Sequence, residues 1–296
     1  MDELRTTVTE EEYAHIIVKP LAGAVGAEID GVDLRDLNDS AFDEIYAAWL
    51  YHHVVVLHDQ HITPEQQLEF ARRFGDIHHH PYMKGLDAYP EIFEILKEPG
   101  DDYTIGSAWH TDQMFSPQPA KATLLLAKET PNAGGDTLFT NMHLAYDTLS
   151  DAMKDMLSDV KVFCASDHFK RTGGSSASRQ DRLKGNTEMA AKMQSTEKPQ
   201  TRTAHPLVRT HPETGRKSLY LGAHVQTLDR FTQAEAAPLI EFLDTHSTRP
   251  EFICRVNWRP GTLVIWDNRS LQHYAIPDHN ERRRMHRVTI GGDTPY

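Results

Sequence analysis

Short apolar runs separated by turn residues recur along the chain, and this pattern predicts many short β-strands. Each run is rich in β-branched, aliphatic or aromatic residues and is bounded by glycine, proline or polar residues. A longer stretch, residues 205–222, predicts a β-hairpin whose turn is the segment PETG. The remaining predicted strands are residues 54–58, 92–96, 122–127, 137–140, 252–258, 262–267 and 284–292.

Three segments predict α-helices. The clearest lies in HITPEQQLEFARRFG, where Thr63 and Gln66 have the spacing of a capping box ahead of an apolar stripe. An earlier helix is expected to begin near Ser40. A later one spans about 232–246, with Pro238 placed where it could kink the helix.

The predicted strands and helices do not alternate as βαβ units, so we expect a mainly β protein, an antiparallel sandwich or jelly roll. The chain has 296 residues, and we expect them to form one domain, residues 1–296. From about 166 to 204 the apolar pattern stops, and Gly, Ser and charged residues prevail. Such a long polar stretch is either a lid or a merely solvated insertion, and we take the lid as the working prediction.

The charge balance argues against one class of partner. With a net charge of −12 at pH 7, no nucleic-acid partner is expected, because phosphate binding needs clustered Lys and Arg. No apolar run approaches the ~20 residues that span a membrane. The acidic N-terminal segment lacks the apolar core of a secretion signal. The two cysteines, Cys164 and Cys254, fit buried thiols in a reducing compartment, so we expect a cytoplasmic protein.

Two candidate metal ligands lie two positions apart in SAWHTDQMF. If this segment is extended, His110 and Asp112 point to the same side. The pair alone is weak evidence, because a chain with 18 histidines contains chance pairings. His273, which follows the apolar run ending at Trp266, offers a third ligand. Two histidines and one carboxylate form the facial triad of non-haem Fe(II) oxygenases, but a zinc hydrolase can use the same ligand types.

Basic residues gather shortly after the third candidate ligand, in the segment RRRMHR at 282–287. If this segment is a strand, Arg283, Met285 and Arg287 share one face. The two guanidiniums on that face can each bind a carboxylate or sulfonate through paired hydrogen bonds. An arginine run on an edge strand can also serve solubility alone. Its position just past His273 favours the binding of a small anion.

These motifs, in this order, resemble the Fe(II)/2-oxoglutarate-dependent dioxygenases typified by taurine dioxygenase and 2,4-dichlorophenoxyacetate dioxygenase. The shared motifs are WHTD, GGDTLF, RTHPETGRKSLY, WDNRSLQHYA and RRRMHR, and the resemblance covers nearly the whole chain. It implies a double-stranded β-helix, a cupin-like jelly roll with flanking helices. It also implies Fe(II), the co-substrate 2-oxoglutarate and O2, together with a homo-oligomer, either a dimer or a tetramer.

The resemblance also implies roles for individual residues. His110, Asp112 and His273 match the iron ligands of the family. Thr137 matches the residue whose hydroxyl binds the distal carboxylate of 2-oxoglutarate, and Arg283 matches the arginine that clamps the same carboxylate.

The substrate side of the resemblance is less uniform. Arg287 matches the arginine that binds the anionic group of the substrate. His80 falls where taurine dioxygenase has a substrate-binding histidine, although a packed loop histidine fits equally well. Met83, Gly106 and Val225 stand where taurine dioxygenase has a tyrosine, an asparagine and an aromatic residue that contact the substrate. GRKSLYLGAH is closer to the phenoxyacetate-degrading branch, so taurine itself is not the expected substrate.

We therefore expect an oxidoreductase that hydroxylates a small organic anion, such as a sulfonate or an aryloxyalkanoate, and releases succinate and CO2. Where the hydroxylated carbon also bears sulfur or ether oxygen, C–S or C–O cleavage is expected to follow. The alternatives are a zinc-dependent hydrolase on a jelly-roll barrel and a non-catalytic jelly-roll binding module. A halogenase would need the carboxylate ligand to be missing, and Asp112 argues against it.

Overall fold

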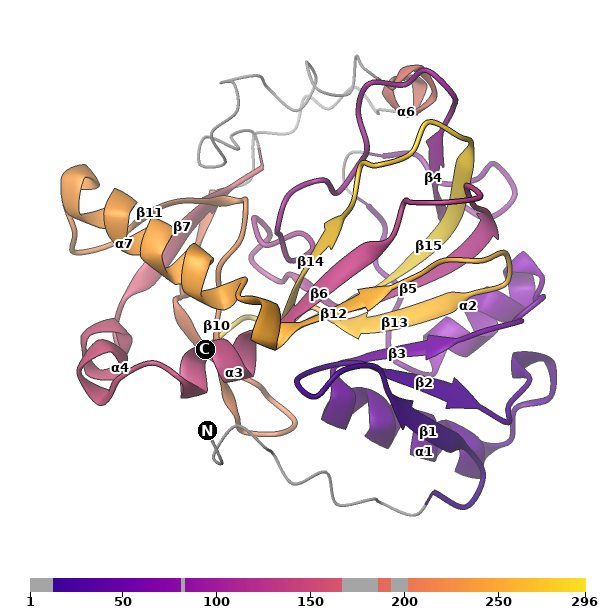
Figure 1. The fold of residues 1–296 in the computed structure, drawn as a ribbon, viewed down its shortest axis with the longest axis horizontal. Coiled ribbons are helices and arrows are strands. Elements are labelled where there is room, and N and C mark those ends of the chain that lie inside the picture. Colours follow the sequence, from indigo (N-terminus) through magenta and orange to yellow (C-terminus); the bar gives the residue numbers. More distant parts are fainter. Residues whose placement is uncertain (1–12, 81–82, 167–185, 193–201) are drawn as a thin grey trace.

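The computed structural model describes residues 13–80, 83–166, 186–192 and 202–296. Within these residues the largest element is a seven-stranded sheet, drawn across the right of Figure 1. Neighbouring strands of this sheet are antiparallel, except for β2 and β3. In sheet order the strands are β1 (Ile17–Pro20), β2 (Ala27–Asp30), β3 (Val54–Leu57), β13 (Leu263–Asp267), β5 (Ala120–Glu129), β15 (Arg283–Gly291) and β4 (Phe93–Lys97).

A smaller sheet packs on one face of the large one, and the two form a sandwich. Its strands, in order, are β12 (Ile253–Val256), β6 (Thr137–Asn141) and β14 (Leu271–Ala275). Alternate residues of β13, such as Val264 and Trp266, pack against Phe139 and Val256 of the small sheet in one buried apolar cluster. The period-two alternation of the strands therefore builds the sandwich core.

Two helices cover the opposite face of the large sheet. They are α1 (Asp39–His52) and α2 (Pro64–Arg72). The other alternate positions of the same strands, Val55, Leu124 and Ile265 among them, pack against the apolar stripe of these helices. The expected capping box is present, since Thr63 and Gln66 bond each other's backbone N–H.

A second lobe is formed by the part of the chain between the sandwich strands β6 and β12, and it is seen at the left of Figure 1. It has its own apolar cluster, to which α3, β7, β10 and α7 contribute. Its strands are β7 (Lys161–Ala165), β8 (Arg202–Pro206) and β11 (Val225–Leu228), and the hairpin strands β9 (Val208–Thr210) and β10 (Lys217–Leu219). Its helices are α3 (Met142–Asp147), α4 (Asp151–Leu157) and α7 (Gln233–Ser247). Two 3-10 helices are also present in the described part of the chain. The first, η2 (Leu34–Asp36), precedes α1, and the second, η3 (Pro250–Phe252), follows α7.

The mainly β, jelly-roll architecture expected from the sequence is confirmed, as are the hairpin and the three predicted helices. Helix α7 is assigned without a break at Pro238. Strand β14 was not predicted, because its sequence LQHYA has no β-branched residue and places Gln272 and His273 in the interior. Among the described helices, none combines the length and apolar character needed to cross a bilayer.

Most of the predicted lid at 166–204 lies outside the described residues. The part that is described contains helix α6 (Thr187–Ala191), which packs on the edge strand β4 through Asn186 and Met189. Residues 202–204 belong to strand β8 rather than to a loop. The single-domain and lid predictions therefore stay predictions.

Candidate active site

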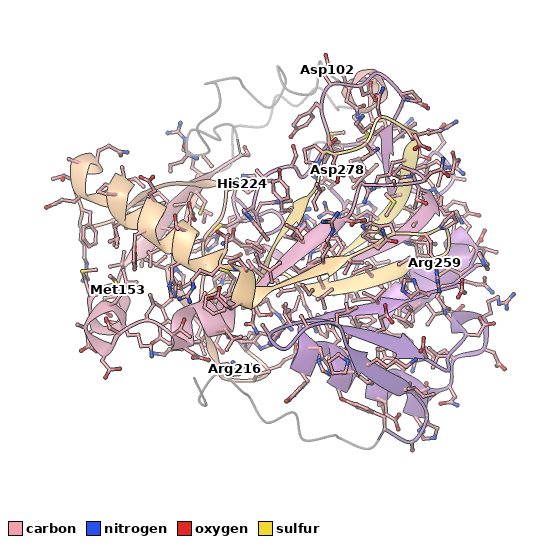
Figure 2. The ribbon with its side chains drawn as sticks, viewed as in Figure 1. Asp102, Met153, Arg216, His224, Arg259 and Asp278 are labelled. Carbon is pink, nitrogen blue, oxygen red and sulfur yellow. The ribbon has the colours of Figure 1, made fainter. Side chains whose placement is uncertain are left out.

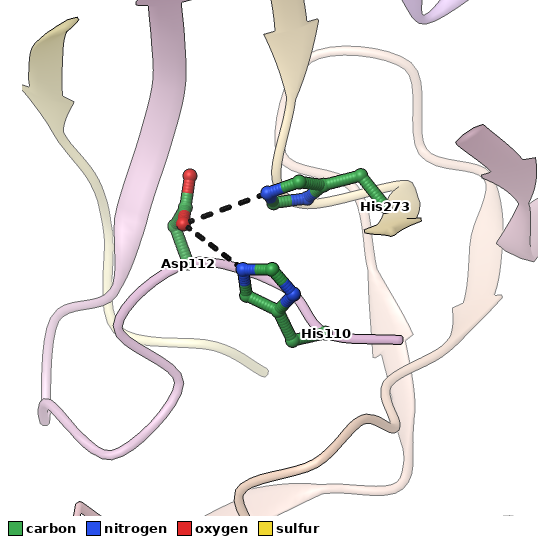
Figure 3. Close-up of side chains that lie close together, drawn as sticks. All are labelled: His110, Asp112 and His273. Atoms are coloured by element: carbon green, nitrogen blue, oxygen red, sulfur yellow. Dashed lines mark ion pairs between the residues drawn. The ribbon is translucent and has the colours of Figure 1, made fainter. Parts of the chain in front are cut away.

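The three predicted metal ligands come together at one end of the sandwich. His273 lies in the middle of β14, where Phe139 and Trp266 pack against its ring. His110 lies in an extended segment that pairs with β14, with reciprocal backbone hydrogen bonds of 3.1 and 2.8 Å between His110 and His273. The pairing of two segments far apart in sequence brings the histidines together, as Figure 3 shows.

The chain passes close to His110 on its other side as well. Gly222 has a φ of +144°, and a Cβ added there would lie 3.2 Å from the His110 Cα. Only glycine adopts this backbone conformation readily and leaves the space free. Ala223 N–H then donates to the carbonyl of Trp109, which holds the ligand segment against the second lobe.

His110, Asp112 and His273, which we call the ligand cluster, point their ligand atoms at one another. Asp112 Oδ1 lies 3.8 Å from Nε2 of each histidine. All three ligand atoms lie within 4.8 Å of one another, and this is the one such group found among the residues that the structure describes. Three converging ligand atoms at this spacing can face a single ion placed between them.

Hydrogen bonds fix the orientation of these ligands. His110 Nδ1 lies 2.7 Å from the carbonyl of Ala108, so the ring donates there and keeps the Nε2 lone pair for a metal. Asp112 Oδ2 accepts from Thr123 Oγ1 at 2.6 Å, which leaves Oδ1 facing the histidines. Asn268 donates to Thr123 and accepts from the Asp112 N–H, so one amide holds both partners. Asn268 was not singled out from the sequence, where it reads as a turn residue.

The electrostatics suit a divalent cation. Burial strongly disfavours charged imidazole, so the pKa values of His110 and His273 lie below the ordinary value. Burial opposes the charge on Asp112 too, but the guanidinium of Arg287 and the hydrogen bond from Thr123 keep the pKa of that carboxyl well below its usual range. The cluster therefore offers two neutral imidazoles and one carboxylate, which are the protonation states that metal binding requires.

Arg287 lies beside the ligand cluster at the wall of a pocket. Its Nη2 is 3.0 Å from Asp112 Oδ2, an ion pair whose angles do not make a hydrogen bond. The pocket has a volume of about 110 Å³, and its polar lining includes His80, Gln113 and His224. Its apolar lining includes Met83, Phe93, Ile105 and Phe115.

The residues predicted to bind substrate are distributed unevenly around this pocket. His80, Met83 and Gly106 line it together with Arg287. Val225 does not, because its side chain is buried in the apolar cluster of the second lobe. The preceding residue, His224, lines the pocket instead, and Figure 2 labels it where the second lobe meets the sandwich. The substrate-facing position that the resemblance gave to Val225 is therefore occupied by His224, the residue just before β11.

The two residues expected to bind 2-oxoglutarate lie inside the sandwich and share a tryptophan. Trp258 Nε1 donates to Thr137 Oγ1 at 3.0 Å, so the hydroxyl proton of Thr137 remains available to another acceptor. The Arg283 guanidinium lies over the Trp258 ring, 5.5 Å from its centroid. Burial lowers the pKa of Arg283 to about 10, opposed by Asp136, and its Nε has no hydrogen-bond partner among the described residues. A buried, incompletely paired cation beside a free hydroxyl proton is a fitting site for a carboxylate.

Comparison with known proteins agrees with this geometry. The model of the family described as "Taurine catabolism dioxygenase TauD, TfdA family" matches residues 17–289. The chain is 33% identical over 291 residues to an alkylsulfatase of Acinetobacter baylyi, covering 97% of this chain and 89% of the relative. It is 33% identical over 282 residues to an (S)-phenoxypropionate/alpha-ketoglutarate-dioxygenase of Sphingobium herbicidovorans, covering 93% and 95%. The crystal structure of a taurine dioxygenase from Burkholderia xenovorans superposes with a TM-score of 0.78 at 33% identity, covering 95% of this chain and 91% of that one.

Proposed function

This chain belongs to the taurine catabolism dioxygenase TauD, TfdA family and is a 2-oxoglutarate-dependent oxidoreductase, and on that premise we propose that it uses Fe(II) to oxidise a small organic anion. One observation carries the proposal: Asp112 Oδ1 and the Nε2 atoms of His110 and His273 converge beside a pocket that Arg287 lines. The zinc hydrolase that the ligand types alone would allow finds no support in the family.

The ligand cluster fits Fe(II) by its donor set. Two neutral imidazoles and one carboxylate are the donor set of non-haem Fe(II) oxygenases, and they would leave room at the ion for other molecules. Bound Fe(II), with 2-oxoglutarate and O2, supplies the oxidising chemistry that yields succinate and CO2 and hydroxylates the substrate. The protein orients the three ligands through Ala108 and Thr123.

Thr137 and Arg283 are proposed to bind the distal carboxylate of 2-oxoglutarate. Arg283 contributes a buried positive charge, and Thr137 contributes a hydroxyl proton that Trp258 leaves free by donating to the oxygen. Because these groups are held by β6, β15 and the loop after β12, the co-substrate would be fixed on rigid elements. Such positioning lowers the entropic cost of bringing the reacting molecules together.

Arg287 and His80 are proposed to bind the acid group of the primary substrate. The Arg287 guanidinium also lies against Asp112, so the acid group would be held next to the ligand cluster. The apolar pocket walls would exclude water from the rest of the substrate. The two relatives named above are an alkylsulfatase and an (S)-phenoxypropionate/alpha-ketoglutarate-dioxygenase, and we propose a sulfonate, sulfate ester or aryloxyalkanoate as the substrate of this chain. Hydroxylation at a carbon that bears sulfur or ester oxygen would be followed by C–S or C–O cleavage.

Two further proposals rest on the sequence and the family resemblance. The buried cysteines Cys164 and Cys254 and the use of Fe(II) suit the reducing cytoplasm. We also propose a homo-oligomer, either a dimer or a tetramer, as the resemblance implies. Light scattering on the purified protein measures the assembly directly, and a monomeric mass would refute it.

The proposed reaction is tested on protein loaded anaerobically with Fe(II). The expected results are 2-oxoglutarate binding before air is admitted and succinate release afterwards, over a panel of sulfonates, alkyl sulfates and aryloxyalkanoates. Succinate release should stop when O2 is withheld. Protein that binds no 2-oxoglutarate and releases no succinate with any member of the panel would refute the proposal.

A further inference from the structure

The residue directly after the carboxylate ligand has features that neither the ligand cluster nor the 2-oxoglutarate site explains. Gln113 is 4% exposed and lines the pocket together with Arg287. Its amide oxygen and amide nitrogen are both buried, and neither has a hydrogen-bond partner among the described residues. Buried polar atoms in folded proteins are nearly always paired, so an amide with both ends unpaired calls for a specific explanation.

The backbone at the same residue is also held in an uncommon conformation. Gln113 has a φ of +54°, a left-handed conformation that residues with a Cβ seldom adopt. Its carbonyl accepts from the Ser116 N–H at 2.8 Å, and the next two residues, Met114 and Phe115, are buried. The hydrogen bond and the two buried side chains therefore fix the turn, and this places the Gln113 side chain in the pocket wall. Strain of this kind is concentrated at sites that bind ligands.

Packing alone does not account for a glutamine here. Leucine or methionine would fill a similar volume without burying an unpaired donor and acceptor, and either would make the folded state more stable relative to the unfolded state. The pocket wall is mixed, with apolar side chains such as Phe93 and Ile105 beside polar ones such as His80 and His224. The amide of Gln113 is a neutral polar group without a hydrogen-bond partner in this wall, and it differs in kind from the cation of Arg287.

We infer that Gln113 reads a neutral hydrogen-bonding group of the primary substrate, a hydroxyl or a carboxamide, in addition to the acid group proposed to bind Arg287. An acid anion offers only acceptors, so it can satisfy the amide nitrogen but leaves the amide oxygen unpaired. A hydroxyl or a carboxamide both donates and accepts, and therefore satisfies both ends of the amide. The inference rests on the proposed function and narrows its substrate to acids that carry such a second group.

A site built to bond such a group discriminates strongly against an analogue that lacks it, because the unmatched protein atoms then remain buried and unpaired. Gln113 is accordingly a specificity-determining residue that touches the substrate. It is not expected to contribute to metal binding or 2-oxoglutarate binding, which use other atoms.

The test compares wild-type protein with Gln113→Leu, and with Gln113→Met as a second variant of closer shape. Protein loaded with Mn(II) and 2-oxoglutarate, without O2, is titrated with hexanoate, with its monohydroxy derivatives substituted at each carbon in turn, and with adipic acid monoamide. In wild type, at least one hydroxylated or amide-bearing acid should bind at least tenfold more tightly than hexanoate. In both variants that ratio should fall to within about threefold of unity, with the affinity for hexanoate unchanged or increased.

A structural role would give different results. If Gln113 only supports the turn, both variants should lose affinity for all acids in equal proportion and should unfold at a lower temperature. The inferred role predicts an unfolding temperature of the metal-free variants that is equal to or above that of wild type, since an unpaired amide has been removed. Wild type that prefers no hydroxylated or amide-bearing acid, or variants that keep the preference, would overturn the inference. The proposed function, by contrast, is overturned only when Fe(II)-loaded wild type releases no succinate.

Discussion

The ligand cluster can be compared with a second buried cluster of histidines and a carboxylate, formed by Asp267, Arg269, His211 and His143. In this second cluster every atom of the carboxylate is paired. Arg269 donates to both oxygens of Asp267, at 2.8 and 2.6 Å, and His211 Nε2 lies 3.0 Å from Oδ2. The other nitrogen of His211 accepts backbone N–H groups of the hairpin turn. We call these four residues the closed cluster.

The two clusters share their residue types but differ in where the lone pairs point. In the ligand cluster the imidazole Nε2 atoms face Asp112 Oδ1 at 3.8 Å, too far for hydrogen bonds, and His110 and Asp112 border a pocket. In the closed cluster both oxygens of Asp267 and both ring nitrogens of His211 are bonded within the protein. Nε2 of His143 has no hydrogen-bond partner among the described residues, but the cluster does not bring three ligand atoms together at one point. Unused lone pairs that converge on one point, rather than the presence of histidine and aspartate, therefore mark the metal site. The closed cluster ties strand β13 to the β9–β10 hairpin instead.

The largest expected effect comes from removing one ligand. His273→Ala should lose stoichiometric Fe(II) binding and all measurable succinate release, because two ligands cannot hold the ion in place. Metal analysis after anaerobic loading, together with a succinate assay, checks this. The exposed His61 supplies a control, since His61→Ala should keep both properties. If His273→Ala kept all of its metal, the ligand cluster could not be the iron site, and the proposed difference between the two clusters would be refuted.

The corresponding change in the closed cluster should affect stability instead. Asp267→Asn leaves the buried Arg269 guanidinium with Glu213 as its remaining carboxylate partner, so the variant should lose up to about 3–5 kcal/mol in the free energy of unfolding. Urea unfolding of metal-free protein measures this difference. At a temperature where the variant is folded, it should still bind one Fe(II) per chain. A loss of metal without a loss of stability would contradict the assignment.

Acid should weaken the closed cluster through His143. Burial lowers the pKa of His143 to about 4, so the folded protein keeps this ring neutral while the unfolded chain protonates it at a higher pH. The associated stability is therefore present above the unfolded value of 6.5 and is lost as the pH falls toward the folded value. This histidine alone should cost roughly 3 kcal/mol between pH 7.5 and pH 4. Unfolding curves of His143→Gln should show a shallower pH dependence by that amount, and identical curves would refute the role.

The smallest expected effect tests the group that orders the proposed 2-oxoglutarate site. Trp258→Phe removes the hydrogen bond to Thr137 but keeps an aromatic face near Arg283. A hydrogen bond is worth about 0.5–1.5 kcal/mol, so the KM for 2-oxoglutarate should rise roughly two- to tenfold, with metal content unchanged. Thr137→Val removes the same hydrogen bond. The free-energy loss of the double variant, calculated from the KM for 2-oxoglutarate, should therefore be smaller than the sum of the two single losses. Fully additive losses would mean that Trp258 and Thr137 affect 2-oxoglutarate binding independently of each other.

The sequence allowed the ligand cluster to be predicted more readily than its surroundings. His110 and Asp112 have the spacing of one strand face, and the order of motifs pointed to His273. Nothing local separated these histidines from His211, because hydrogen-bond saturation depends on which carbonyls and turns the fold brings near. Gln113 could not be found, because its role depends on burial without a partner and on a positive φ, neither of which leaves a periodic pattern.

The same limit applied to the fold. The strands β3, β13, β5 and β15 of the large sheet were predictable because their apolar runs are buried on both faces, between the helices and the small sheet. Strands β1 and β2 of the same sheet were missed, and β1 is largely exposed. Strand β14 and most strands of the second lobe were missed, since polar residues such as Gln272 face inward and exposed residues such as Phe163 face outward. Long-range packing decides these positions, and a local window of sequence does not contain it.

The most direct test of the difference between the two clusters is an anaerobic crystal structure of the Fe(II)-loaded protein, with the ion located by anomalous scattering. We predict a single iron peak at bonding distance from His110 Nε2, Asp112 Oδ1 and His273 Nε2, and no metal peak at Asp267 or His211. Iron bound at the closed cluster, or a ligand cluster that remains empty in protein carrying one iron per chain, would contradict the assignment.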